Sequence, residues 1–176
     1  TNHDDNYFML LAVPPSTSND KIDIPKEVIF VVDVSGSMKG TSINQAKNSL
    51  HYSIERLNNE DSFNIIAYSD HYFSMKKYPI EMNESNIDSA KTFINSLHAG
   101  GGTKAIGPLK EAMLMNTDTN KLKMIIFITD GDLGYEKDVF NLVNKYISNS
   151  RLFCVGIGSA PNGHLLEKVS EKGRGT

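Results

Sequence analysis

The stretch from Val28 to Ser37 reads VIFVVDVSGS, and the rest of the chain can be arranged around it. Its first five residues are apolar and mostly β-branched, which is typical of a strand buried on both faces in a parallel sheet. The apolar run ends at Asp33, and Ser35 and Ser37 follow on either side of Gly36, a residue that permits a tight turn. Oxygen ligands at the carboxyl end of a central strand suit a small divalent cation. The stretch therefore predicts both a core strand and a site.

Apolar patterning elsewhere predicts strands that alternate with helices. A second continuous apolar run, from Met124 to Ile128, predicts another core strand, and an acid, Asp130, follows it too. The other predicted strands cover 62–68, 151–157 and, at an edge of the sheet, 71–75. Apolar residues at steps of three and four predict helices over 42–57, 85–97 and 136–148, with two more starting near Ala105 and His164.

This alternation indicates βαβ crossovers. We predict an α/β fold with a doubly wound, mostly parallel sheet, helices on both faces and a short antiparallel edge strand, as in Rossmann-like proteins. Residues 1–25 are interpreted as a lead-in strand, Tyr7 to Val13, and a linker, and residues 26–176 as one domain. Because the chain starts at Thr1 rather than Met, we expect it to be a piece of a longer protein.

Composition narrows the classes of partner. The chain has 176 residues, of which 39% are hydrophobic and 22% charged, and its net charge is −3. This charge does not favour a nucleic acid or an anionic membrane as partner. No apolar run approaches the roughly 20 residues of a membrane-spanning helix, so direct membrane insertion is not expected. The single cysteine, Cys154, excludes an internal disulfide and is predicted to be buried and unreactive.

The two acids that follow the core strands define the candidate site. If those strands are neighbours, the carboxylates of Asp33 and Asp130 lie close together, and a cation is needed to neutralise them. Thr103 follows three glycines, which allow the backbone to approach the same point. Two carboxylates and three hydroxyls, from Asp33, Ser35, Ser37, Thr103 and Asp130, form an oxygen-only set that selects Mg²⁺, Mn²⁺ or Ca²⁺.

Each part of this set has a simpler interpretation. Asp33 alone can cap a turn, and either serine can cap the helix that follows. The glycines before Thr103 can mark the end of one helix and the start of another. Asp70 and Asp132 could add negative charge to the rim of the metal site, but they are most simply residues of solvated turns. The metal interpretation rests on the joint occurrence of these residues at the ends of both core strands.

Three segments carry a resemblance to a known family. DVSGS at 33–37, GGT at 101–103 and TDG at 129–131 resemble, in that order, the metal-ion-dependent adhesion site of von Willebrand factor type A domains. The resemblance covers the chain from about residue 26 onward. The lead-in at 7–15, VDVSGSM at 32–38 and AGGGT at 99–103 are most similar to the A domain of inter-alpha-trypsin inhibitor heavy chains and related bacterial surface proteins.

The resemblance implies a role for each site residue. Ser35 and Ser37 would ligate the metal directly, Thr103 directly or through water, and Asp33 and Asp130 largely through water. It further implies that an Asp or Glu of a partner protein fills an open metal position, in adhesion without chemical turnover. An extracellular or cell-surface location is implied as well. Near the C-terminus, the family's last strand and helix are expected to be missing.

Two other function classes compete with a binding module. One is a Mg²⁺-dependent phosphoryl-transfer enzyme that uses Asp33, because phosphatases also place an Asp at the end of a central strand. Such enzymes usually need a second carboxylate two residues later, where this chain has Ser35. The other is a purely structural domain with a degenerate site, which the intact motif disfavours. We therefore predict a non-enzymatic module.

Overall fold

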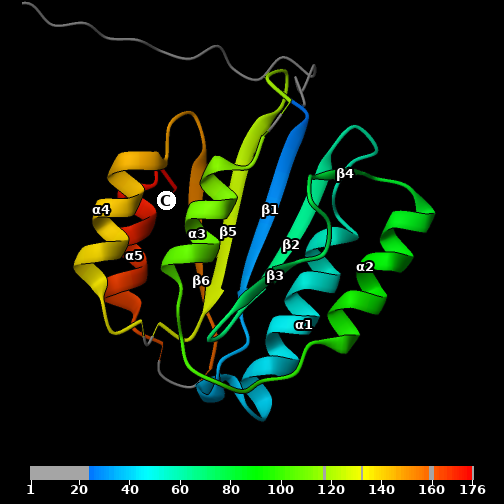
Figure 1. The fold of residues 1–176 in the computed structure, drawn as a ribbon. Helices are drawn as coiled ribbons and strands as arrows, with labels where there is room; N and C mark the ends of the chain where they lie inside the picture. The colour runs from blue at the N-terminus through cyan, green and yellow to red at the C-terminus, as the bar shows by residue number, and fades with distance from the viewer. Residues whose placement is uncertain (1–23, 117, 132, 159–160, 176) are drawn as a thin grey trace, which may run out of the picture.

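β1 (Lys26–Asp33) lies in the middle of the sheet of this protein, shown in Figure 1 as a computed structural model. The structure describes residues 24–116, 118–131, 133–158 and 161–175, so the predicted strand at 7–13 falls outside the described residues. The other elements are the 3₁₀ helix η1 (Gly36–Met38), α1 (Thr41–Ile54), β2 (Ser62–Tyr68), β3 (Tyr72–Ser74), β4 (Ile80–Glu81), α2 (Glu84–Ser96), α3 (Ile106–Leu114), β5 (Leu122–Thr129), α4 (Glu136–Tyr146), β6 (Arg151–Gly156) and α5 (Gly163–Lys172).

The sheet has the predicted doubly wound topology. Within the described residues it is six-stranded, with the order β3-β2-β1-β5-β6 and with β4 paired to β2. β1 runs parallel to both β2 and β5, and β6 runs parallel to β5. The short strands β3 and β4 pair antiparallel with β2. The predicted fold class, including the antiparallel edge strand, is confirmed.

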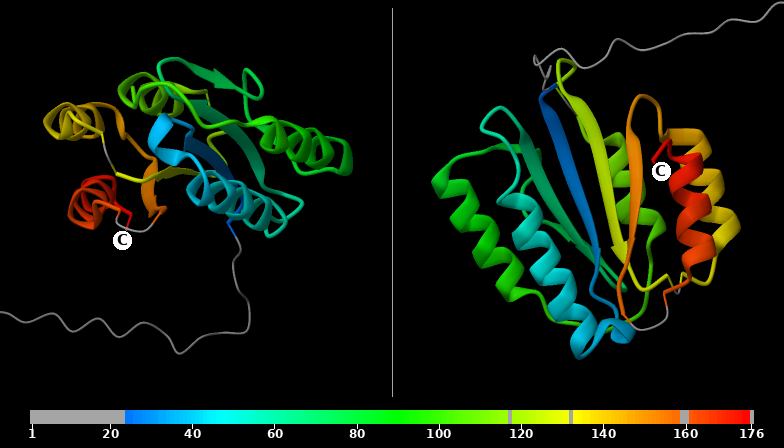
Figure 2. Two further views of the ribbon diagram at one scale, coloured as in Figure 1. Left: turned by 90° about the horizontal axis from the view of Figure 1, so that it is seen from below. Right: turned by 180° about the vertical axis from the view of Figure 1, so that it is seen from behind.

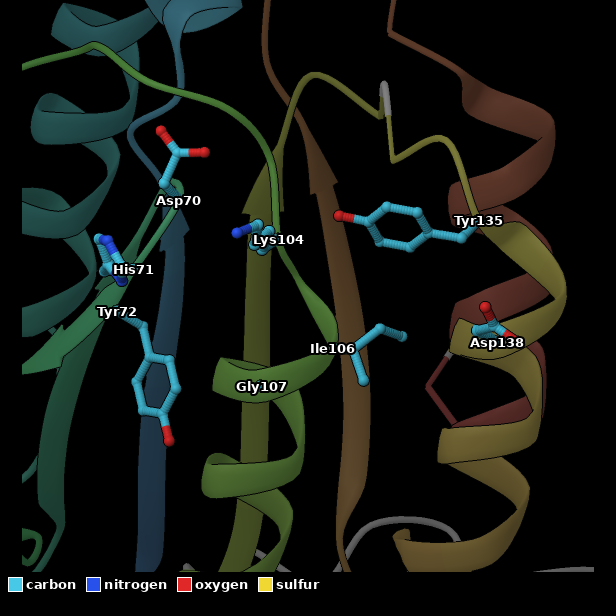
Figure 3. Close-up of a pocket in the computed structure, with 8 residues that line it drawn as sticks. All are labelled: Asp70, His71, Tyr72, Lys104, Ile106, Gly107, Tyr135 and Asp138. Atoms are coloured by element: carbon cyan, nitrogen blue, oxygen red, sulfur yellow. The ribbon is translucent and has the colours of Figure 1, made fainter.

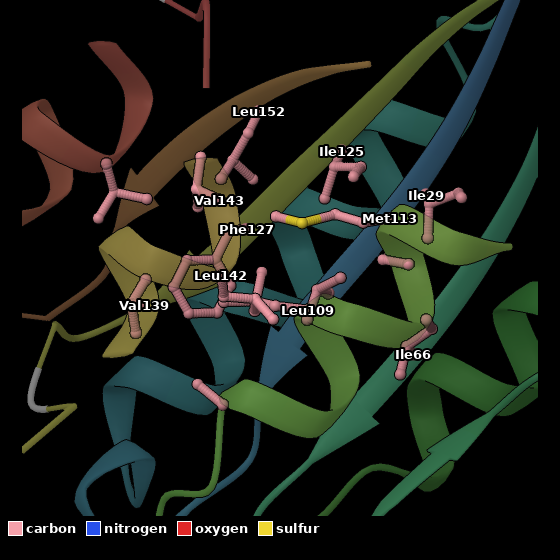
Figure 4. Close-up of a cluster of buried hydrophobic side chains, with 14 of the residues drawn as sticks. Ile29, Ile66, Leu109, Met113, Ile125, Phe127, Val139, Leu142, Val143 and Leu152 are labelled. Atoms are coloured by element: carbon pink, nitrogen blue, oxygen red, sulfur yellow. The ribbon is translucent and has the colours of Figure 1, made fainter. Parts of the chain in front are cut away.

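Side chains of β1 alternate between two apolar cores, as the pleat of a strand requires. Val28, Phe30 and Val32 pack with α1 and α2 on one face of the sheet. Ile29 and Val31 pack on the other face with α3, α4 and α5, and Figure 4 shows part of this second core. Two views of the ribbon show the helices on both faces (Figure 2). This two-sided burial explains why residues 28–32 of β1 are apolar without interruption.

Helix ends differ from the prediction by a few residues. α1 ends at Ile54 rather than at residue 57, because the amides of Arg56 and Leu57 bond to carbonyls three residues back, which tightens the last turn. α4 ends at Tyr146 rather than at residue 148, where Ser148 has a positive φ of 45°. η1 and β4 were not predicted, since three and two residues are too few to show a period.

Two further expectations concern membrane insertion and the reactivity of Cys154. No helix of the described segments is long and apolar enough to cross a membrane. Cys154 is half-buried against the second core, rather than fully buried as predicted, and this burial raises the pKa of its thiol to about 11. Because the thiolate is the reactive form, this pKa agrees with the predicted unreactive thiol.

Candidate metal centre

Asp33 is the last residue of β1, and its side chain is completely buried between the two neighbouring strands. Oδ1 accepts a hydrogen bond of 2.8 Å from the Ser35 backbone N–H. Oδ2 accepts hydrogen bonds from the Tyr68 hydroxyl at 3.1 Å and from the Thr129 hydroxyl at 2.9 Å. The carboxylate therefore connects the ends of β1, β2 and β5.

Burial dominates the protonation of this carboxyl group. It raises the pKa of Asp33 above its ordinary value, while the hydrogen bonds from Ser35 and Thr129 oppose the rise. The negative charge of Asp130 raises the pKa of Asp33 further. The Tyr68 hydroxyl has a pKa well above its ordinary value, through burial first and then the charge of Asp33, so it stays protonated and donates. A nearby positive charge would favour the ionised form of Asp33.

Ser35 and Ser37 place two hydroxyl oxygens side by side. η1 follows Ser35 directly, and its tight turn brings the two Oγ atoms to 3.0 Å from each other. Mg²⁺ binds oxygen at about 2.0–2.1 Å in an octahedron, so neighbouring ligand oxygens stand about 2.9 Å apart. Ser35 is buried and Ser37 is exposed. The pair therefore fits two adjacent positions around a small cation that remains open to solvent.

The glycine loop before Thr103 lies against these serines. The Gly36 amide donates to the Gly101 carbonyl at 2.9 Å, and the Gly100 amide donates to the Val34 carbonyl at 2.8 Å. Gly101 has a φ of +81°, a region that favours glycine. A Cβ at Gly36 would lie 3.1 Å from the Gly101 carbonyl oxygen. Both glycines are therefore needed for the close approach of the two segments.

Two side chains that were not predicted as site residues position Thr103. Asp70 accepts a 2.8 Å hydrogen bond from the Gly102 amide through Oδ2. The Tyr135 hydroxyl donates to the Thr103 carbonyl, and Figure 3 shows this ring pointing toward the segment that carries Lys104. Asp70 does lie in an exposed turn, as predicted, but it also holds the loop. Thr103 itself is half-buried.

Asp130 follows β5 and completes the predicted set. β5 pairs directly with β1, so Asp33 and Asp130 stand at the ends of neighbouring parallel strands, as predicted. The chain connects β1 to β2 on one side and returns to β5 on the other, which makes this the position where ligands bind in open α/β sheets. Thr129, which was also not predicted, donates to Asp33 and accepts from the Gly131 amide at 3.0 Å.

For Tyr68 and Thr129, the only signal in the sequence is their position at the ends of predicted strands. Both residues end strands that flank β1, and Tyr68 is the register partner of Asp33. That register becomes known only when the strands are paired, so the sequence alone did not show which polar side chains meet the carboxylate.

The donor set contains oxygen atoms only. Among the described residues, no group of three or more His, Cys, Asp or Glu side chains is placed to hold a metal. The candidate site thus depends on the hydroxyls of the two serines and of Thr103, with the buried carboxylate of Asp33 behind them. This set of oxygen atoms suits Mg²⁺, Mn²⁺ or Ca²⁺ better than softer metals. Asp132 lies outside the described residues. The assignment of the five residues as metal ligands stays a prediction.

Comparison with known proteins agrees with the fold. A family model described as von Willebrand factor type A domain matches residues 26–176. A von Willebrand factor A domain-containing protein of Dictyostelium discoideum is 28% identical over 175 residues, covering 98% of this chain and 19% of that protein. Inter-alpha-trypsin inhibitor heavy chain H4 of Bos taurus is 30% identical over 187 residues, covering 95% of this chain and 19% of that protein. The chain thus spans 19% of the length of these two curated relatives.

Solved structures show the same fold. A von Willebrand factor type A protein from Catenulispora acidiphila superimposes with a TM-score of 0.78 at 24% identity, covering 86% of this chain and 38% of that chain. The manganese-loaded TRAP protein of Plasmodium vivax superimposes with a TM-score of 0.66 at 18% identity, covering 84% of this chain and 63% of that chain. At these identities the likeness concerns the fold alone.

The buried charge of Asp33 predicts a pH-dependent effect of Asp33→Asn in EDTA. Between the unfolded pKa near 3.9 and the raised folded pKa, the native wild-type protein binds more protons than the unfolded chain. Its free energy of unfolding therefore falls as pH rises through this window, by at most about 1.4 kcal/mol per pH unit. Asp33→Asn lacks this titration, so its stability relative to wild type should increase as the pH rises from the unfolded pKa through the raised folded pKa, as measured by urea denaturation at a series of pH values.

Asp88→Asn is the matched control, because Asp88 is an exposed carboxylate on α2. Its stability should follow that of wild type at each pH. A difference between wild type and Asp33→Asn that does not change with pH would contradict the interpretation.

Proposed function

Because the chain belongs to the von Willebrand factor type A domain family, whose members commonly mediate protein interactions, we propose that it is a metal-dependent protein-binding module. Asp33, Ser35, Ser37, Thr103 and Asp130 hold a divalent cation, which is Mg²⁺ or else Mn²⁺ or Ca²⁺. An Asp or Glu side chain of a partner protein completes the site. No chemical turnover is part of this function.

The paired hydroxyls of Ser35 and Ser37 carry the proposal. Their Oγ atoms lie 3.0 Å apart at the mouth of the site, and the Asp33 carboxylate is held behind them by three hydrogen bonds. In this role Ser35, Ser37 and Thr103 supply neutral oxygens, while Asp33 and Asp130 orient them and supply negative charge from behind. A cation bound in this way supplies an electrophilic centre with room for a carboxylate from outside.

The relatives support the cofactor and the location. The Plasmodium vivax structure of the same fold is manganese-loaded, which supports a divalent cation as the cofactor in this chain. Similarity to an inter-alpha-trypsin inhibitor heavy chain supports an extracellular or cell-surface location, within a larger protein. The net charge of −3 supports a protein partner rather than a nucleic acid.

Phosphoryl transfer by Asp33 is not favoured. A nucleophilic carboxylate needs an accessible oxygen with a free lone pair directed at the substrate. Asp33 is completely buried, and both of its oxygens already accept hydrogen bonds from Ser35, Tyr68 and Thr129. These contacts suit a residue that orients a site better than one that attacks a phosphorus atom.

Metal binding is tested with Mn²⁺ alone, measured by electron paramagnetic resonance of the free ion. Wild-type protein should bind one equivalent, and Ser37→Ala should weaken binding by about tenfold or more, because it removes a ligand oxygen. Ser37 is exposed, so the melting temperature in EDTA should not change. Ser89→Ala, which alters an exposed serine on α2, is the control and should bind Mn²⁺ as wild type does. Equal binding by all three proteins would refute the site.

The acidic partner is tested by selecting displayed random peptides on the Mg²⁺-loaded domain and eluting them with EDTA. The recovered peptides should contain Asp or Glu, and replacing that residue by Asn or Gln should weaken binding by about tenfold or more. The same selection on Ser37→Ala should yield no EDTA-sensitive peptides. Peptides that stay bound in EDTA, or that lack an acid, would count against this part of the proposal.

A further inference from the structure

A pocket of about 540 Å³ opens beside the candidate metal centre (Figure 3). The start of α3, at Ile106 and Gly107, forms its floor. Tyr72 of β3 lies on one side, and Tyr135, just before α4, lies on the other. The pocket therefore lies between the antiparallel edge of the sheet and the helices that follow the site.

The pocket and the metal centre share a wall. Tyr135 lines the pocket, and its hydroxyl donates to the carbonyl of Thr103. Asp70 also lines the pocket and accepts from the Gly102 amide at 2.8 Å. The next residue, Lys104, lines the pocket and donates its amide to the Ser69 carbonyl at 2.9 Å. The pocket thus begins one residue beyond a predicted metal ligand.

The short distance between the metal centre and the pocket limits which partner segments can contact both at once. Thr103 and Ile106 are three residues apart, and three extended residues span at most about 10 Å. A partner segment whose acid lies at the metal centre therefore places a side chain in the pocket from a position within about three residues of that acid.

The lining selects an uncharged, flat or bulky apolar group. The rings of Tyr72 and Tyr135 and the side chain of Ile106 supply the apolar surface. Tyr72 is 45% exposed, so much of its ring has no cover from the chain itself. A Cβ at Gly107 would lie 2.9 Å from Cε1 of Tyr72, so the absence of a side chain there lets the ring lie against α3. Exposed aromatic surface around a pocket is typical of a binding anchor site.

The charges around the pocket give little preference for a charged occupant. Asp70 and Asp138 contribute two carboxylates, and Lys104 and His71 stand among them. One Asp70 oxygen is already occupied by the Gly102 amide. A cation would meet Lys104, and an anion would meet the two carboxylates, so neither gains as much as an apolar group that covers the rings.

We propose that this pocket receives an aromatic or large aliphatic side chain of the partner, within three residues of the acid that binds at the metal centre. This inference rests on the proposed function and specifies its ligand as an acid next to an apolar anchor. The pocket supplies affinity and selectivity that a single carboxylate lacks, because many proteins expose acids and few pair them with an apolar side chain at this spacing.

The test uses defined small acids rather than an unknown partner. Mg²⁺-loaded, ¹⁵N-labelled protein is titrated with unbranched alkanoates and with the phenylalkanoates of the same chain length, and amide shifts are followed by NMR. At one chain length the phenyl acid should bind about tenfold more tightly, as expected for burying much of an aromatic ring. The amides of Ile106 and Gly107 should shift with the phenyl acid only.

Two tyrosine variants show whether the pocket is responsible for the preference for the phenyl acid. Tyr72→Ser removes one wall and should reduce the preference for the phenyl acid to about twofold or less. Tyr52→Ser, at a 58%-exposed tyrosine on α1, is the matched control and should keep the full preference. The methyl esters of the phenyl acids should lose binding, since they lack the carboxylate.

The outcomes separate this inference from the proposed function. If Mn²⁺ binds as predicted but phenyl and alkyl acids bind equally, the pocket proposal is overturned and the metal site stands. If the preference survives Tyr72→Ser unchanged, or the phenyl acids bind equally well in EDTA, the pocket proposal is overturned as well. If Mn²⁺ does not bind at all, the proposed function is refuted, and the pocket proposal, which rests on it, is overturned with it.

Discussion

The buried carboxylate of Asp33 is the constraint on which the rest of the site depends. It lies at the end of the central strand and accepts hydrogen bonds from the Ser35 backbone, the Tyr68 hydroxyl and the Thr129 hydroxyl. These three donors come from the turn after β1 and from the last residues of β2 and β5. A single side chain therefore fixes where the ends of three parallel strands stand, and the serine turn is built on that position. These neutral donors only partly offset the cost of burying a negative charge so deeply, which is the physical reason to expect a cation nearby.

The site separates negative charge from the groups that face the solvent. The acids Asp33 and Asp130 follow the core strands, whereas the exposed Ser37 and the half-buried Thr103 offer neutral oxygens. In the proposed function, this arrangement keeps a bound cation attractive to a further carboxylate, because its charge is only partly neutralised by the chain. The loop that carries Thr103 has its own supports in Asp70 and Tyr135, and these also border the neighbouring pocket. The metal centre and the pocket thus both border the loop that carries Thr103.

Much of this architecture could be predicted from the sequence, and the reasons are physical. The uninterrupted apolar runs of β1 and β5 mark strands covered on both faces, and the amphipathic spacing of α1, α2 and α4 marks helices that cover them. From residue 26 onward, the structure confirms the predicted strands and helices to within a few residues, the parallel neighbours and the antiparallel edge, whereas the predicted strand at 7–13 stays a prediction. It also brings Asp33, Ser35 and the glycine loop together, although metal binding by these residues stays a prediction. Tyr68, Thr129 and the loop contact of Asp70 were not foreseen, because strand register and side-chain hydrogen bonds between distant segments leave no local pattern.

The central claim is that the hydroxyls of Ser35 and Ser37, supported by Asp33, hold a divalent cation. The most direct measurement is anomalous X-ray scattering from a crystal of this domain grown with Mn²⁺. The account predicts one strong anomalous peak within bonding distance of both Oγ atoms, with the Asp33 carboxylate behind them and still bonded to Tyr68 and Thr129. No peak at this position, together with hydroxyls that point away from each other, would contradict it.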